Sequence, residues 1–95
     1  MIVEFSGPII YWRGPAPFYF VKVPLAEAAE IKAISKHITY GWGCIPATVT
    51  IGNTQWYTAL FPKDDHYLVP VKAVIRKAEN VEDGDTVTVR LEMGN

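Results

Sequence analysis

The sequence has a single cysteine, Cys44, and no surplus of basic residues. One cysteine cannot form an internal disulfide, so the fold does not depend on an oxidising compartment. Nine lysines and arginines against ten acidic residues give a formal net charge of −1. This balance argues against non-specific nucleic-acid binding, which is driven by neutralisation of phosphates. The soft metal ligands are also few, and His37, Cys44 and His66 lack the short paired spacing typical of zinc sites. We expect no metal.

The sequence also lacks targeting and cofactor motifs. The segment Met1–Phe5 contains no basic residue, so a secretory signal is not expected. Residues 38–62 are uncharged over 25 positions, which is long enough to cross a bilayer, but their glycines and period-two alternation indicate paired strands. The Gly41-Trp42-Gly43 segment lacks a third glycine and precedes a strand, unlike a phosphate-binding loop. We expect no cofactor and a soluble cytoplasmic protein.

Ninety-five residues give one domain, residues 1–95, made mostly of strands. Alternating apolar residues, bounded by glycine and proline clusters such as Ser6-Gly7-Pro8, predict strands over 2–5, 9–12, 18–23, 45–51, 54–61, 66–69 and 86–93. Gly52-Asn53 is typical of a tight hairpin turn, because both residues tolerate positive φ. Pro24 and Pro70 suit the first turn of a helix. They predict helices over 25–37 and from Pro70 to a left-handed Asn80.

Each predicted helix has one apolar stripe, which should face the core. The expected buried positions are Leu25, Ala28, Ile31, Ile34 or Ser35, and Ile38 in the first helix, and Val71, Val74, Ile75 and Ala78 in the second.

Two segments, 21–51 and 67–89, repeat one plan of strand, proline, helix, glycine-containing turn and strand. Two β-α-β halves favour a pseudo-symmetric closed barrel, in which each half covers the apolar face of the other. The segment Val69–Ala78, followed by Gly84–Val89, resembles the swapped-hairpin half-barrel of AbrB-type proteins. This likeness suggests DNA binding by fold analogy alone.

The whole chain resembles a bacterial family called domain of unknown function nineteen-oh-five, over roughly residues 2–93. The matching stretches are Gly41–Pro46, Thr50–Trp56, Leu60–Lys63 and Tyr67–Ala78. The resemblance implies a small closed β-barrel of the double-split type with two short helices. It implies no particular activity.

The strongest polar candidate is a basic cluster on the second helix. Lys72 and Arg76 lie four residues apart on one face, with Lys77 beside them, and like charges at this spacing repel unless an anion lies between them. That anion is either an internal carboxylate, such as Asp83 or Asp85, or a phosphate or carboxylate of a ligand, which arginine binds with two parallel hydrogen bonds. A plain solvated face is the third interpretation, and all three stay open.

The aromatic residues supply the other candidates. Trp42 lies between two glycines in a turn and is expected at a pocket mouth or an interface. The strand 54–61 has large residues on both faces, so a helix or another protein should cover one of them. We therefore expect a ligand-binding surface built from Trp42, Trp56, Lys63, Lys72 and Arg76.

Three functions fit these observations. The favoured one is a non-enzymatic module that binds a small anion or a protein partner, with a monomer favoured over a homodimer because a closed barrel needs no partner to close. The alternative is nucleic-acid binding, as in AbrB-type barrels. The third is an enzyme for a small anionic substrate, with Arg76 or Lys72 binding the substrate anion and His66 or Asp65 as acid or base. Cys44 is a weak candidate for a nucleophile, because a single free cysteine is more often buried and inert.

Overall fold

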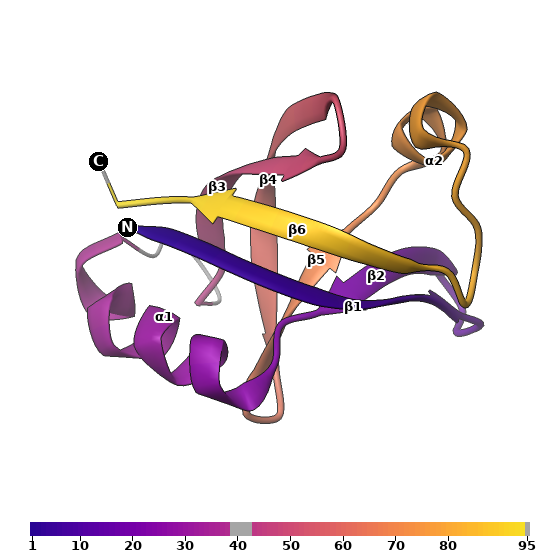
Figure 1. Cartoon of the computed structure of the whole chain (residues 1–95). Coiled ribbons are helices and arrows are strands. Elements are labelled where there is room, and N and C mark those ends of the chain that lie inside the picture. The colour runs from indigo at the N-terminus through magenta and orange to yellow at the C-terminus, as the bar shows by residue number, and fades with distance from the viewer. Residues whose placement is uncertain (39–42, 95) are drawn as a thin grey trace.

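The computed structural model describes residues 1–38 and 43–94 of the chain. In this part six strands and two helices follow one another as β1 (Ile2–Trp12), β2 (Phe18–Lys22), α1 (Leu25–Ile38), β3 (Ile45–Ile51), β4 (Thr54–Lys63), β5 (His66–Pro70), α2 (Ala73–Glu79) and β6 (Thr86–Glu92). The strands close into an antiparallel barrel in the order β1-β2-β5-β4-β3-β6 (Figure 1). The predicted class, a closed and mostly β barrel with two helices, is confirmed. The double-split subtype stays a prediction.

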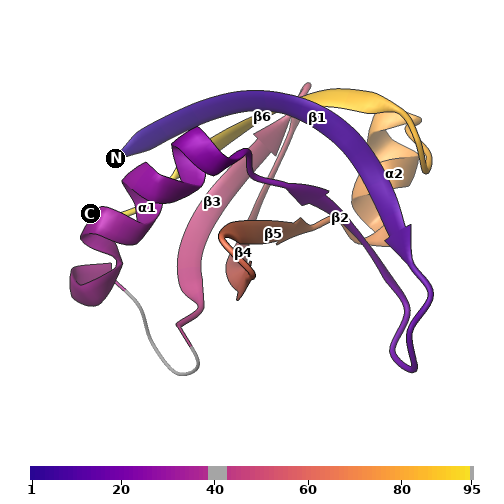
Figure 2. The same cartoon turned by 90° about the horizontal axis from the view of Figure 1, so that it is seen from below.

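The long strand β1 pairs with β6 through its first part and with β2 through its second part. It arches over the barrel to reach both partners (Figure 2). The prediction that Ser6-Gly7-Pro8 ends a strand is therefore wrong. Pro8 is the last residue of the β1–β6 ladder, opposite Thr86, and the N–H that proline lacks is dispensable at the end of a ladder.

The strand β4 bends in the same way, pairing first with β3 and then with β5. Exchanging β1 with β4, β2 with β5 and β3 with β6 gives the same set of neighbouring strand pairs in the barrel. The strand order is therefore that of two equivalent halves, β1-β2-α1-β3 and β4-β5-α2-β6. This arrangement agrees with the repeat predicted from the sequence.

The core fills the barrel with side chains that alternate along each strand. In β3 every second residue is buried, from Ile45 to Ile51, and β6 shows the same period through Val87, Val89 and Leu91. Between β3 and β4 lies the predicted two-residue turn, in which Gly52 alone has a positive φ, of 57°. A first central glycine of this kind is characteristic of a type II′ hairpin turn.

The helix α1 begins directly after Pro24, as predicted, but its buried stripe is narrower than expected. Ala28 and Ile31 are buried, whereas Leu25 is 58% exposed. Leu25 is the first residue of the helix. The predicted burial of Ile38 and the role of His37 concern side chains outside the described part.

The helix α2 begins later than predicted, because Pro70 is the last residue of β5 and Lys72 is the N-cap. Among its seven residues only Ile75 is buried, and Val74 is 68% exposed. The predicted burial of Val74 and Ala78 is wrong, because this two-turn helix packs against the core through Ile75. Asn80 ends the helix in the left-handed conformation, as predicted, with φ 53° and ψ 49°.

The other boundaries differ by one or two residues. β2 ends at Lys22, β4 continues through Pro62 to Lys63, and β6 ends at Glu92. Neither helix of the described part has the length and apolar character that a membrane span requires.

Candidate functional site

Aromatic side chains gather where β1 and β2 form a hairpin, on both faces of the two strands. Tyr11 is paired with Tyr19 in the register, and their ring centroids lie 4.7 Å apart. Trp12 is paired with Phe18 on the opposite face, with ring centroids 5.6 Å apart in an edge-to-face arrangement. Because neighbouring residues of a strand point to opposite faces, the hairpin carries one ring pair on each side.

The outer ring pair continues along the outside of the barrel. The Phe18 ring lies 5.4 Å from the Phe20 ring, centroid to centroid, and Phe20 and Leu68, on the neighbouring strands β2 and β5, are both buried. Trp12 and Phe61 are only half covered, with 42% and 44% of their surfaces exposed. The outer face of β2, β5 and β4 is therefore apolar and partly open to solvent.

This face contains a groove of about 590 Å³, which we call the hairpin groove. Its walls come from the β1–β2 hairpin, the end of β5 and the start of α2: Trp12, Ala16, Pro17, Phe18, Tyr19, Phe61, Pro70, Val71, Lys72, Ala73 and Arg76. The only charged residues among them are Lys72 and Arg76. The groove is therefore aromatic and apolar with a positive rim.

A smaller hollow of about 100 Å³ adjoins the hairpin groove. It is lined by Phe20, Leu68 and Lys63, and it shares Trp12 and Phe18 with the groove. We call it the Lys63 hollow. Its one charged residue is again a cation, so the positive character extends along the ring face.

Arg76 is the most tightly positioned cation of the groove. Its Cζ lies 3.5 Å from the centroid of the Tyr19 ring, and its Nη1 donates a hydrogen bond to the Val71 carbonyl at 2.7 Å. The ring and the carbonyl together fix the plane of the guanidinium. Because a guanidinium is weakly hydrated, its removal from water against the ring costs little free energy. The remaining N–H groups of Arg76 have no acceptor among the described residues, so they are available to a ligand.

The carboxylates expected beside Arg76 have other partners. Asp83 Oδ1 accepts a hydrogen bond from the Tyr11 backbone N–H at 3.0 Å, and Asp85 Oδ2 accepts one from the Glu82 N–H at 2.8 Å. Within residues 1–38 and 43–94 the ion pairs involve Arg90 alone. An internal ion pair therefore does not explain the Lys72–Arg76 spacing in the described part.

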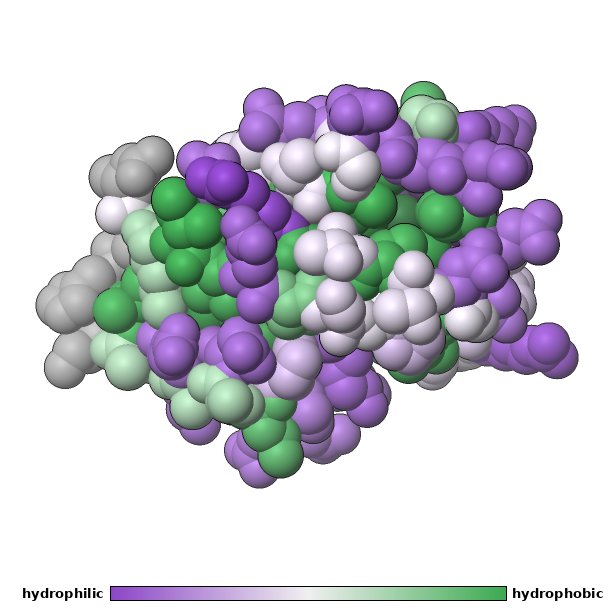
Figure 3. All heavy atoms as spheres, viewed as in Figure 1, coloured by the Kyte–Doolittle hydropathy of each residue, from purple (hydrophilic) through white to green (hydrophobic). Residues whose placement is uncertain are grey.

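A further hollow, of about 450 Å³, adjoins the hairpin groove at Arg76 and is lined by α2 and the loop that follows it. Its charged residues are Arg76, Lys77, Glu82 and Asp83, so its charges are balanced. In Figure 3 hydrophilic side chains lie along the outer edge around α2, and hydrophobic ones are visible near the start of β1 and between β6 and α2. Tyr19, Ala73 and Arg76 line both the balanced hollow and the hairpin groove.

The position of α2 depends on a contact with the β3–β4 turn. The Glu79 carboxylate accepts hydrogen bonds from the Thr54 hydroxyl and from the Asn53 N–H, the latter at 3.4 Å. Gly52 permits this approach, because a Cβ at this position would lie 1.9 Å from Glu79 Oε1. We call this contact the Glu79 lock. It fixes the C-terminal end of the helix that carries Arg76.

The structure brings together three of the five residues predicted for the site. Lys72 and Arg76 line the hairpin groove, and Lys63 lines the adjoining hollow. Trp56 lies elsewhere: it packs against the core, and its buried Nε1 has no hydrogen-bond partner. Trp42 lies outside the described residues.

Sequence analysis missed the rings that form most of the groove, namely Trp12, Phe18, Tyr19 and Phe61. The available signal was the aromatic density on both sides of residues 13–17. Two adjacent strands rich in rings and joined by a short loop must place those rings side by side.

The residues considered for catalysis are not brought to the groove. His66 does not line the groove, and its Nδ1 lies 2.8 Å from the Val23 carbonyl oxygen, while Asp65 is exposed in the β4–β5 turn. Cys44 is buried. In the part of the chain that the structure describes, no three histidine, cysteine or acidic side chains are grouped as metal ligands.

Comparison with known protein families gives one finding. The chain matches the family model described as Domain of unknown function (DUF1905) over residues 5–91, which is nearly its whole length. The chain therefore belongs to this family, as its resemblance predicted. No curated protein matches the chain.

Proposed function

We propose that this DUF1905 member is a binding module that takes a small anionic ligand with an apolar body in the hairpin groove. The observation that carries the proposal is a groove whose two charged residues, Lys72 and Arg76, are both cations without a carboxylate partner among the described residues. Its volume of about 590 Å³ falls within the range of small-molecule sites.

The geometry favours recognition of a carboxylate or phosphate beside a flat apolar group. Tyr19 and the Val71 carbonyl hold Arg76 in place before any ligand arrives, so little side-chain entropy is lost on binding. The rings of Trp12 and Phe61, which are half exposed, offer apolar surface that a ligand would cover. Fixed charge and open rings together suit an aromatic or aliphatic anion.

Single-stranded nucleic acid is the second candidate, because exposed rings beside cations form the platforms on which bases stack. Two observations weigh against it: the net charge is −1, and Glu82 and Asp83 line the hollow that adjoins the groove at Arg76. A gel-shift titration against salt separates the two functions. Binding that weakens steeply with salt concentration would favour nucleic acid.

Catalysis on a small anion, the third candidate, requires an acid or base beside the cations. His66 and Asp65 are not among the residues that line the groove. The groove as it stands therefore supports binding, with Arg76 as the residue that selects for negative charge.

A matched pair of probes tests the proposal. Indole-3-acetate and its neutral amide, indole-3-acetamide, have the same ring and size and differ in charge. We expect the carboxylate to bind about fivefold more tightly, because a charge-assisted hydrogen bond on a partly exposed arginine contributes about 1 kcal/mol. Isothermal titration calorimetry measures both affinities.

Arg76→Gln should remove the preference for the carboxylate, and Lys32→Gln, on the exposed surface of α1, should leave it unchanged. Amide NMR shifts on titration should map to β1, β2 and the start of α2. Equal affinities for the two probes in the unmodified protein, or shifts confined to another face, would contradict the proposal.

A further inference from the structure

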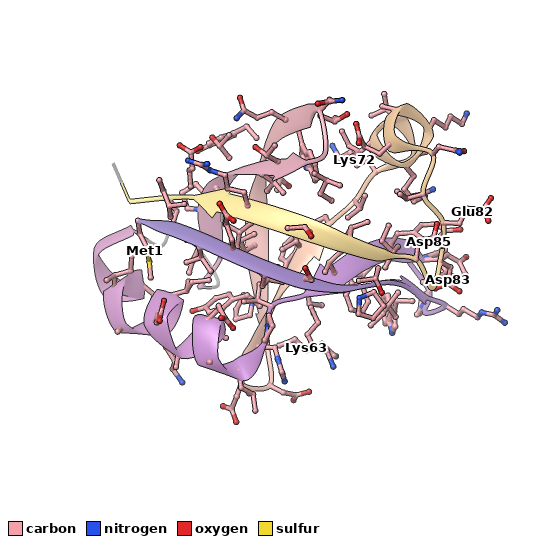
Figure 4. All side chains as sticks on the ribbon, in the orientation of Figure 1. Met1, Lys63, Lys72, Glu82, Asp83 and Asp85 are labelled. Carbon is pink, nitrogen blue, oxygen red and sulfur yellow. The ribbon has the colours of Figure 1, made fainter. Side chains whose placement is uncertain are left out.

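The hairpin groove and the Lys63 hollow form one elongated depression, because Trp12 and Phe18 line both. Lys72 and Arg76 lie at one end of this depression, and Lys63 lies at the other. Lys63 and Lys72 are found on opposite sides of the β1 and β6 ribbons in the view of Figure 4. Aromatic and aliphatic side chains separate the two positive ends.

The register of the strands sets the span between these ends. Lys63 is paired with His66 at the start of β5, and Lys72 follows the end of β5 by two residues. Lys72 lies six positions after His66 in the sequence, so in a fully extended chain their backbones lie at most about 20 Å apart. The lysine side chains can shorten this distance from both ends, which leaves a span that one elongated small molecule can bridge.

We propose that the ligand of this depression is an elongated dianion, with an anionic group at each end and an apolar middle. The inference rests on the proposed function and deepens it by naming the class of ligand. The evidence is charge complementarity: the depression has a cation at each end, rings between them, and no carboxylate among the described residues that line it. A monoanion would satisfy one end only.

The closed barrel favours a small molecule over an extended peptide as this ligand. Peptides that bind in extended form usually add a strand to a free sheet edge. The strands β2 and β5, which lie under the depression, are each paired with a neighbour on both sides. The depression instead presents side chains, which suits a compact ligand held by its ends.

A homologous series of linear dicarboxylates tests the inference: adipate, suberate, sebacate and dodecanedioate. Each is compared with its monomethyl ester, which has nearly the same length and apolar surface but a single charge. We expect the dianion to bind about two- to fivefold more tightly than its half-ester at the chain length that reaches both ends, since an exposed lysine contributes modestly to an ion pair. The advantage should be smaller for shorter and longer members.

Three variants assign the two ends. Lys63→Gln should remove the advantage of the dianion and leave the affinity of the half-ester unchanged, whereas Arg76→Gln should weaken both. Lys32→Gln should change neither. Half-esters that bind as tightly as the dianions at every length, or an advantage that survives Lys63→Gln, would overturn the inference while leaving the proposed function intact. Failure of every half-ester and of indole-3-acetate to bind would overturn both.

Discussion

Replacing Gly52 by alanine tests whether the Glu79 lock holds α2 in place. The new Cβ would lie 1.9 Å from Glu79 Oε1, so the carboxylate must move away and lose its hydrogen bonds to Thr54 and Asn53. Alanine would also be strained at the φ of 57° that Gly52 adopts. The substitution therefore has two separable effects, one on the backbone and one on the lock.

Each effect has an expected size. An alanine in this glycine-only backbone conformation costs about 1–3 kcal/mol, and the two partly exposed hydrogen bonds of Glu79 contribute about 1–1.5 kcal/mol together. Gly52→Ala should therefore lower the free energy of unfolding by about 2–4.5 kcal/mol, and Glu79→Ala by about 1–1.5 kcal/mol. The double variant should lose no more than Gly52→Ala alone, because the hydrogen bonds of Glu79 can be lost only once. The expected coupling energy is about 1–1.5 kcal/mol.

Urea denaturation, followed by tryptophan fluorescence, measures all four proteins of this cycle. Gly84→Ala is a matched control: its φ is 90°, yet a Cβ there would meet nothing within 4 Å. It should show backbone strain alone and no coupling to Glu79→Ala. Losses from Gly52→Ala and Glu79→Ala that add within about 0.5 kcal/mol would refute the lock.

Two further predictions concern the positioning of the site. Tyr19→Leu should weaken binding of indole-3-acetate about fivefold by titration calorimetry, because it removes the ring that orients Arg76, while Tyr19→Phe keeps the ring and should retain the affinity. A loss that is equal for the two variants would show that the hydroxyl, not the ring, matters. Asp83→Ala should lower the free energy of unfolding by about 1 kcal/mol, because the Tyr11 N–H loses its acceptor. Asp83→Asn keeps an acceptor oxygen and should lose less in the same urea assay.

The fold was largely predictable from local signals. The alternation in β3 and β6 and the glycine of the β3–β4 turn each depend on neighbours in sequence, and they were placed correctly. The repeat of strand, proline and helix predicted two equivalent halves, and the strand order has that symmetry. Local sequence patterns were sufficient to predict an element wherever its conformation depends on residues close to it in the sequence.

The errors arose where tertiary pairing overrides local punctuation. Pro8 and Pro62 lie inside long strands because β1 and β4 change partners at these points, which no local signal reveals. Pro70 extends β5 instead of starting a helix, since the β2–β5 ladder pairs it with Phe20. The length of α2 was overestimated for the same reason.

The site was predictable through its cations and not through its rings. The spacing of Lys72 and Arg76 indicated an anion site from the sequence, because spacing along a helix is a local property. The contribution of Tyr19 depends on the contact between the β1–β2 hairpin and α2, which come from different halves of the chain. This contact forms only when the barrel closes, so no local pattern in the sequence indicates it.

The two halves of the chain have equivalent strand orders, but the residues of the groove have no equivalents at the matching positions. Alignment of the helix starts, Leu25 with Ala73, places Pro24 at the position of Lys72 and Ala28 at the position of Arg76, so α1 lacks the cation pair of α2. The β1–β2 connection, which has rings on both sides at Trp12 and Phe18, corresponds to the β4–β5 turn, which contains Asp64 and Asp65. Symmetric positions explain why the barrel closes, since each must pack in the same way. The cations and rings of the groove break this symmetry, so the equivalence of the two halves does not account for them. Their presence in one half alone is what a ligand would explain.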